Sequence, residues 1–360
     1  MKRLFVVASL AIMAVGCQKT TVENEVLTQI GFNTEVGKQT RTIVDNQYDN
    51  AESFGVYAIA YQSGTKLNIV MPDETIARRV TSPDGAETPT YAWKATSPYY
   101  WPNDANTTLN FYAYSPKSIQ AKMEVEGTLT LTAYEHKQEN INTLDFMAAT
   151  PVTGATFAKP DGKTVAASDA DKGKVPVVFN HQMTQVLFTV NANVGTDITV
   201  TLNSIKLNHV TNKADYSSNL TNNVIANWSS KGTGSYTIYP VGTQVAKPIP
   251  TDGITSTAAT MIPQTLNATV KTGETISTQG QQFEVEYTIG GTGVAHETVT
   301  KKIDLKAGTV VEWAPNRKII YNLTVGLNEI TFEPTVVGWD DDQNPETTDG
   351  PIISGNISIN

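Results

Sequence analysis

Apolar and polar residues alternate along most of the chain with a period of two, which is the pattern of half-buried β-strands. The first such run contains Val26, Thr28, Ile30 and Phe32. Further strand-like runs cover residues 54–61, 109–114, 128–133, 185–190, 197–207, 283–289, 298–305 and 318–325. Thr, Val, Ile and Tyr dominate these runs, as a pleated and half-buried surface favours.

Gly, Pro, Asn and Asp separate the runs at short intervals, and no helix of three or more turns is predicted after the first residues. Many short strands with turn signals between them predict an all-β protein made of antiparallel β-sandwiches. A polar stretch at residues 154–174 contains no predicted strand. We expect the boundary between two tandem domains there, with an N-terminal sandwich at 42–176 and a C-terminal sandwich at 177–339.

The N-terminus has the composition of an export signal. Lys2 and Arg3 precede an apolar run over residues 4–15, which is too short to span a bilayer. Ala14-Val15-Gly16-Cys17 resembles a lipobox, in which the signal is cut before a Cys that is then acylated. We expect a lipoprotein signal peptide at 1–16 and lipidation of Cys17; the alternative is an ordinary secretory signal.

Cys17 is the only Cys of the 360-residue chain, so no internal disulfide can form. Stability must come from hydrophobic cores of considerable size. The formal charge is −9, and removal of Lys2 and Arg3 with the signal lowers it to −11. No run of basic residues occurs, so nucleic acid is not an expected partner.

The motifs of common enzymes are missing, and we predict neither an enzyme nor a cofactor. There is no nucleophile elbow and no phosphate-binding loop. His296-Glu297 resembles the start of a zinc protease motif, but Thr300 stands where the second His should be. The four His, at 136, 181, 209 and 296, suggest no metal site.

Three segments each allow a binding interpretation and a structural one. His181 could be a ligand or base, but we interpret it as a hydrogen-bonded structural residue. Tyr99-Tyr100-Trp101-Pro102 could stack on a sugar, but we expect it in a core. Asp340, Asp341 and Asp342 with Asn344 could bind calcium. Because Pro345 stands where an EF-hand loop needs Gly, we expect a solvated linker instead.

The tail, residues 340–360, is an acidic linker followed by an isolated strand-like segment. Ile353, Gly355, Ile357 and Ile359 lie on one face of that segment, and polar residues occupy most of the other face. We interpret it as a strand donated to another subunit. The alternative is that it pairs within its own domain as the last strand.

Several segments together resemble the fimbrillin family, the type V pilus proteins of Bacteroidales. They are Tyr99-Tyr100-Trp101-Pro102 followed by residues 109–114, Leu144-Asp145-Phe146-Met147, Phe179-Asn180-His181-Gln182-Met183, Met261-Ile262-Pro263-Gln264, and Trp313-Ala314-Pro315-Asn316 leading through Tyr321 to Val337-Gly338-Trp339. These segments, in this order and at this spacing, extend over nearly the whole exported chain. The resemblance implies two tandem sandwiches of transthyretin-like topology.

The resemblance also implies a mechanism of assembly. Shaft subunits of the family are exported as outer-membrane lipoproteins, cut after an Arg by a surface protease, and joined when a strand of the next subunit fills the opened groove. Residues 17–41 would be the removable segment, with cleavage after Arg41 in a polar stretch. The alternative is that Arg41 is an ordinary surface residue. Arg78-Arg79 is a rival site, but cutting there would also remove the strand at 54–61.

The leading functional hypothesis is therefore a non-catalytic subunit of a surface pilus with a role in adhesion. Its expected partners are other pilus subunits, joined head to tail, the outer membrane through a lipid anchor, and an Arg-specific protease. The alternative is a surface lipoprotein that binds glycans and never polymerises. A hydrolase is the third hypothesis, and no motif supports it.

Overall fold

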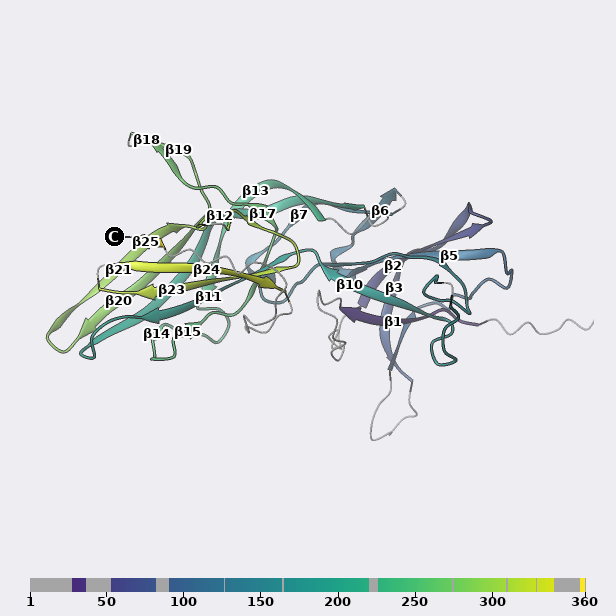
Figure 1. Cartoon of the computed structure of the whole chain (residues 1–360), viewed down its shortest axis with the longest axis horizontal. Helices are drawn as coiled ribbons and strands as arrows, with labels where there is room; N and C mark the ends of the chain where they lie inside the picture. The colour runs from purple at the N-terminus through teal and green to yellow at the C-terminus, as the bar shows by residue number, and fades with distance from the viewer. Residues whose placement is uncertain are drawn as a thin grey trace, which may run out of the picture.

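The computed structural model describes residues 28–36, 53–81, 91–125, 127–163, 165–219, 226–273, 275–308, 310–327, 329–339 and 357–359. These residues form two β-rich lobes that lie end to end (Figure 1). In this part of the chain the helical segments are two single 3-10 turns, η1 (Lys117–Ile119) and η2 (Gln138–Asn140). The expected all-β class is confirmed.

The first lobe contains eight strands that share one sheet. In spatial order they are β2 (Ser53–Gln62), β3 (Thr65–Val80), β4 (Tyr91–Ala95), β1 (Gly31–Val36), β10 (Lys174–His181), β8 (Met147–Ala149), β5 (Thr107–Ser115) and β9 (Val152–Ala155). Because β5 also pairs with β2, the path from β2 round to β5 closes into a ring. Closure satisfies backbone groups that an open sheet would leave at its edges.

Apolar side chains two positions apart fill the interior of this ring. Phe54, Val56 and Ala58 of β2 belong to its core. Ile59 of the same strand belongs to a different cluster, at the junction of the lobes. Both faces of β2 are therefore covered, which explains why buried residues occur at consecutive positions along it.

The second lobe is a sandwich of two sheets. One contains β15 (Ile254–Thr255), β11 (Thr184–Ala192), β23 (Arg317–Val325), β24 (Ile330–Gly338) and β25 (Ile357–Ile359), with β16 (Ala259–Met261) also on β11. The other contains β21 (Val294–Asp304), β20 (Gln282–Gly291), β12 (Ile198–Asn219), β7 (Thr128–Glu135) and β6 (Lys122–Val125), with β13 (Ala226–Tyr239) and β14 (Lys247–Pro248) on β12. Two small ladders complete it, β17 (Gln264–Thr265) with β22 (Glu312–Trp313) and β18 (Val270–Thr272) with β19 (Thr275–Thr278).

Aromatic rings join the two sheets of the second lobe. Phe283 of β20 lies 5.3 Å, centroid to centroid, from Phe188 of β11. It also contacts Phe332 of β24 at 5.4 Å, edge to face. Such pairs bury large apolar areas and prefer this geometry. The core they form supplies the stability that a chain without disulfides needs.

Most strand pairs are antiparallel, as expected, but each lobe contains one parallel pair. In the first lobe β1 runs parallel to β10, and in the second lobe β11 runs parallel to β23. Parallel partners need a long connection between them, and about 140 and 130 residues separate the two pairs, respectively. A wholly antiparallel arrangement was therefore wrong at these two pairs. The transthyretin-like topology stays a prediction.

The junction of the lobes is packed with aromatic residues. Phe146, Tyr216 and Trp228 lie together, with ring centroids 4.8 Å apart for the first two and 4.9 Å apart for the last two. Tyr216 and Trp228 both bond to Gln182, which connects β10 to β11. β6 and β7 come from the first half of the chain, yet they pair in a sheet of the second lobe. The predicted domain boundary between residues 176 and 177 therefore stays a prediction.

The other strand-like runs are confirmed, and only the first differs in position. The strand expected at 26–32 is observed as β1, Gly31–Val36, while Val26 lies outside the described residues. Ile30 and Phe32 are buried, as the alternation requires. Between 154 and 174 the described residues contain the end of β9, one isolated bridge between Thr156 and Lys159, and the first residue of β10.

Candidate functional site

β1 lies between β10 and β4 in the first-lobe ring. We call the position that β1 fills between these two strands the seam. It pairs with β10 along its whole length, with Gly31 opposite Lys174. On its other side Phe32 lies opposite Trp93 of β4. Removal of β1 would therefore open the ring and leave β4 and β10 as two unpaired edges.

Phe32 of β1 and Ile30, which directly precedes β1, form part of the first-lobe core. Ile30 and Phe32 are 2% and 3% exposed. The ring of Phe32 meets Phe54 and Phe111 edge to face, at 5.9 and 6.0 Å. Burial of these two side chains contributes about 3–6 kcal/mol, at about 1.5–3 kcal/mol each. A strand that replaced β1 would have to fill the same apolar positions.

A pocket of about 300 Å³ lies beside β1, over its N-terminal half. Gly31 has no side chain, and Lys174 Cγ lies 3.4 Å from where its Cβ would be. Lys94, Lys172 and Lys174 are among the residues that line the pocket, together with the neighbouring Asn33. The pocket is therefore rimmed by positive charge.

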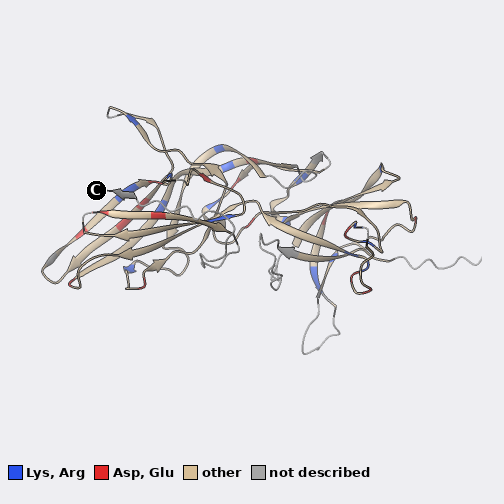
Figure 2. Ribbon diagram, viewed as in Figure 1, with Lys and Arg blue, Asp and Glu red and all other residues tan. Residues whose placement is uncertain are grey.

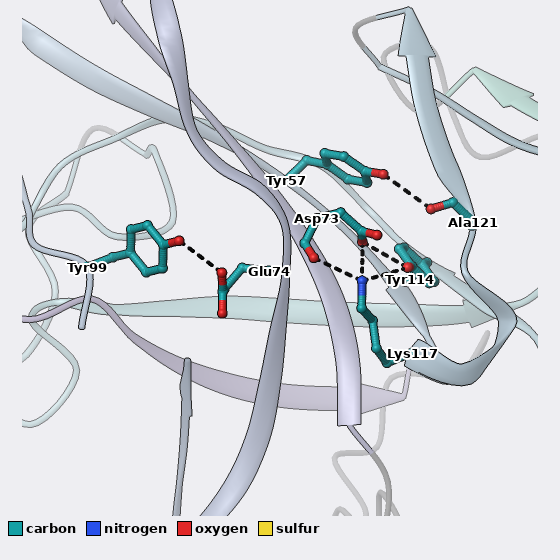
Figure 3. A network of polar contacts seen from close by, with 7 residues as sticks. All are labelled: Tyr57, Asp73, Glu74, Tyr99, Tyr114, Lys117 and Ala121. Atoms are coloured by element: carbon teal, nitrogen blue, oxygen red, sulfur yellow. Dashed lines mark hydrogen bonds and ion pairs between the residues drawn. The ribbon is translucent and has the colours of Figure 1, made fainter. Parts of the chain in front are cut away.

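A network of polar contacts connects β3 to its neighbours in the ring (Figure 3). Lys117 Nζ lies 2.6 Å from a carboxylate oxygen of Asp73, and the Tyr114 hydroxyl donates to the same carboxylate at 2.8 Å. Burial, together with the Asp73 carboxylate, raises the pKa of Tyr114, so its hydroxyl remains a donor. Tyr99 donates to Glu74 at 2.9 Å. These contacts attach β5, η1 and the 99–101 segment to β3, and their role is structural.

The C-terminal segment pairs with the second lobe. Residues 357–359 form β25, antiparallel to β24, with Ile357 opposite Phe332 and Ile359 opposite Ile330. β25 is the edge of its sheet. Ile353 and Gly355 lie outside the described residues. The donor-strand assignment stays a prediction.

The remaining predicted assembly residues are only partly within the described chain. Cys17, Arg41 and Asp340–Asp342 lie outside it. The rival cleavage site, Arg78-Arg79, lies inside β3, where both residues pair with β4. An Arg in a paired strand is a poor substrate, because proteolysis favours exposed loops.

The structural interpretation of His181 is confirmed. The ring is buried, and its Nδ1 lies 2.5 Å from a carboxylate oxygen of Asp145. It stacks on Trp339, with centroids 4.3 Å apart and planes 12° apart. His181 ends β10 and Trp339 follows β24, so the stack joins the two lobes.

The expectation that Tyr99-Tyr100-Trp101-Pro102 lies in a core is confirmed for Trp101. This residue is 3% exposed, and its Nε1 donates to the Gly173 carbonyl at 3.1 Å. Tyr100 remains 42% exposed. A buried indole cannot stack on a sugar, so the segment does not form a continuous aromatic platform.

The described chain offers no metal site. His296 lies in the strand β21 and not on a helix. No group of three metal-binding side chains occurs among the described residues. In the same part of the chain, no helix combines the length and apolar character needed to cross a membrane.

Sequence reasoning did not identify the lysine-rimmed pocket. Its residues come from three separate segments, 29–33, 92–94 and 172–174. Only the pairing of β4, β1 and β10 brings them together. A signal was present in the two lysines of Lys172-Gly173-Lys174, but two lysines two positions apart usually mean a solvated surface.

Comparison with known proteins gives the family. The fimbrillin-like family model matches residues 40–339, and the chain belongs to this family. The fold is similar to that of a fimbrial protein from Bacteroides vulgatus, with 20% identity over 86% of this chain and 99% of that one, and a TM-score of 0.59. A proposed cell adhesion protein from Bacteroides ovatus is 15% identical over 88% of this chain and 99% of that one, with a TM-score of 0.50. No curated protein sequence matches.

Family membership confirms the fimbrillin resemblance and defines the chain as a structural protein of the pilus and adhesion type, not an enzyme. The two structural similarities agree in fold. How subunits of this chain would join is a separate question, which the geometry of β1 addresses.

Proposed function

We propose that this chain is the lipoprotein precursor of a surface pilus subunit that polymerises by strand exchange. Cys17 carries the lipid anchor in the outer membrane, and an Arg-specific protease cuts after Arg41. The cut releases β1, and the C-terminal strand of another subunit takes its place. Repeated head-to-tail contacts of this kind do not close and therefore form a fibre.

The position of β1 is the observation that carries the proposal. β1 completes the first-lobe core, yet residues 37–52 separate it from β2, the next strand along the chain. A cut in that stretch leaves β1 held by backbone pairing and buried side chains alone. The vacated seam would offer two strand edges and an apolar trough, and both favour the addition of an extended strand.

Insertion of the donor strand requires both the burial of apolar side chains and backbone pairing. Burial of Ile353, Ile357 and Ile359 would contribute roughly 5–9 kcal/mol, at about 1.5–3 kcal/mol each. Ordering nine backbone residues costs about 1–2 kcal/mol apiece. Backbone pairing with β4 and β10 must supply the difference, and a seam with an edge on each side provides such pairing.

The N-terminus of the surface fibres tests this function. Fibres sheared from cells should begin at Thr42, as read by Edman degradation or mass spectrometry. The Arg41→Ala variant should retain the N-terminus of the precursor and form few fibres, whereas Arg79→Ala should behave as wild type. Fibres that still begin at Cys17 would overturn removal of β1.

A further inference from the structure

The lysine-rimmed pocket beside β1 is lined by positive charge, and strand exchange alone does not explain this charge. Lys174 is exposed and lies opposite Gly31, while Lys94 is half-buried and follows Trp93, the residue opposite Phe32. The two lysines therefore flank the same point of β1 from its two neighbours. In the described part of the chain neither has a carboxylate partner.

None of the other described charges near the pocket forms an ion pair with Lys94 or Lys174. Lys172 forms an ion pair with Asp169, at 2.7 Å. Asp171 accepts a hydrogen bond from Ser168. Figure 2 shows both basic and acidic residues on the ribbon of the first lobe. Lys94 and Lys174 are thus available to a negatively charged partner.

The chain contains a partner of the required chemistry. Residues 340–350 contain Asp340, Asp341, Asp342, Glu346 and Asp349, and residues 340–360 contain no Lys or Arg. This acidic segment directly precedes the predicted donor strand. Asp349 lies four residues before Ile353, about 13 Å of extended chain. A donor strand in the seam would therefore bring the acidic segment of a second copy to one end of the seam that β1 has left.

We propose that Lys94 and Lys174 bind the acidic segment, residues 340–350, of a second copy, and that this contact sets the direction of the incoming strand. The inference rests on the proposed strand exchange. The pocket lies at the N-terminal half of β1, over residues 29–33. Only a strand that runs in the direction of β1, parallel to β10, places its preceding linker there.

The reverse direction would place the acidic linker at the other end of β10. There the linker would meet the His181–Asp145 pair and neither of the two lysines. Exposed charge pairs of this kind act mainly on the rate and specificity of encounter, and salt screens them. The lysines therefore select the correct orientation while the buried face supplies affinity.

Cysteine cross-linking between full-length copies tests the direction. Processing removes Cys17, so engineered cysteines are the only thiols in the fibre. Cells co-express one copy with Asp349→Cys and one with either Lys174→Cys or Asn180→Cys. After treatment with a homobifunctional thiol reagent that spans about 13 Å, we expect cross-linked dimers in sheared fibres for Lys174→Cys and not for Asn180→Cys. The opposite result, or fibres without either cross-link, would overturn the inference, whereas wild-type cells without fibres would overturn the proposed function itself.

Charge reversal tests the lysines independently. Lys94→Glu with Lys174→Glu should slow fibre growth by about tenfold at low salt and much less at high salt. A second copy with Asp340→Lys, Asp341→Lys and Asp342→Lys should restore growth. This rescue requires that the copy with the two lysine substitutions is folded, so it also controls for misfolding. Lys247→Glu with Lys271→Glu, two exposed lysines of the second lobe, is the matched control. Equal growth in the two charge-reversed pairs would contradict the proposal.

Discussion

His136 is the clearest case of a single titratable residue held by the fold. It is 1% exposed, with Nε2 2.8 Å from the Thr260 carbonyl and Nδ1 3.0 Å from the Tyr134 hydroxyl. The carbonyl can only accept, so Nε2 carries the proton and Nδ1 accepts from Tyr134. Burial lowers the pKa of His136 to about 4, and the ring is neutral in the folded protein.

The stability of the second lobe should therefore depend on His136 below pH 6.5. Between pH 6.5 and 4 the unfolded chain binds a proton that the folded chain does not, so stability falls as the pH falls. The wild type should lose about 2–3 kcal/mol more than His136→Gln between pH 7.5 and 4.5, as measured by urea unfolding. Gln is neutral at both pH values and can still donate to Thr260. Identical pH profiles would contradict the assignment.

At the scale of the element, the contribution of β1 to stability should change when the precursor is cut after Arg41. Phe32→Ala removes a buried ring from the first-lobe core, and such changes cost about 3–5 kcal/mol. We expect this loss in the free energy of unfolding of the uncut precursor. Asn33→Ala, on the exposed face of the same strand, is the control.

The same substitution should leave the stability of sheared fibres unchanged, because the proposed fibre no longer contains β1. Resistance of wild-type and Phe32→Ala fibres to guanidinium measures this. A parallel loss in precursor and fibre would show that β1 stays in place after assembly.

The C-terminal strand is the second element with two candidate positions. Deletion of residues 351–360 should leave an exported, folded monomer that forms no fibres, and Ile357→Asp should have nearly the same effect. In the structure β25 covers the edge of β24 through three residue pairs, which is little pairing to lose. Electron microscopy of cells and circular dichroism of the monomer measure the two outcomes. Normal fibres from the deletion variant would exclude donation, and an unfolded monomer would support the pairing on β24.

At the scale of the whole molecule, attachment to the membrane should depend on one residue. Cells fed a clickable fatty acid should label the wild-type precursor and not Cys17→Ala. One acyl chain holds a protein only weakly, so stable anchoring requires more than one chain on this residue. Equal labelling of the two would contradict lipidation, whatever the state of the fibres.

The junction gives the two lobes a common aromatic core. Tyr216, Trp228 and Phe146 pack there, and His181 stacks on Trp339 across the junction. A large apolar contact of this kind opposes independent movement of two domains. Force applied along a fibre would therefore pass through both lobes.

The sequence by itself determined the local features of this protein. Alternation with a period of two depends only on neighbouring residues, so the strands at 54–61, 128–133 and 318–325 could be predicted. The burial of Ile30, Phe32 and Trp101 followed from the same alternation or from residue type. Family membership was visible in short segments such as Phe179-Asn180-His181-Gln182-Met183 and is confirmed over residues 40–339.

Only the tertiary structure decided which strands are neighbours. The parallel pairing of β1 with β10, the closure of the first-lobe ring through β2 and β5, and the place of β6 and β7 in the second lobe join residues far apart in the chain. Backbone hydrogen bonds are the same for every residue type, so the alternation of a strand does not encode its partner. Lys94 and Lys174 meet beside Gly31 for that reason, and no local pattern could have shown it.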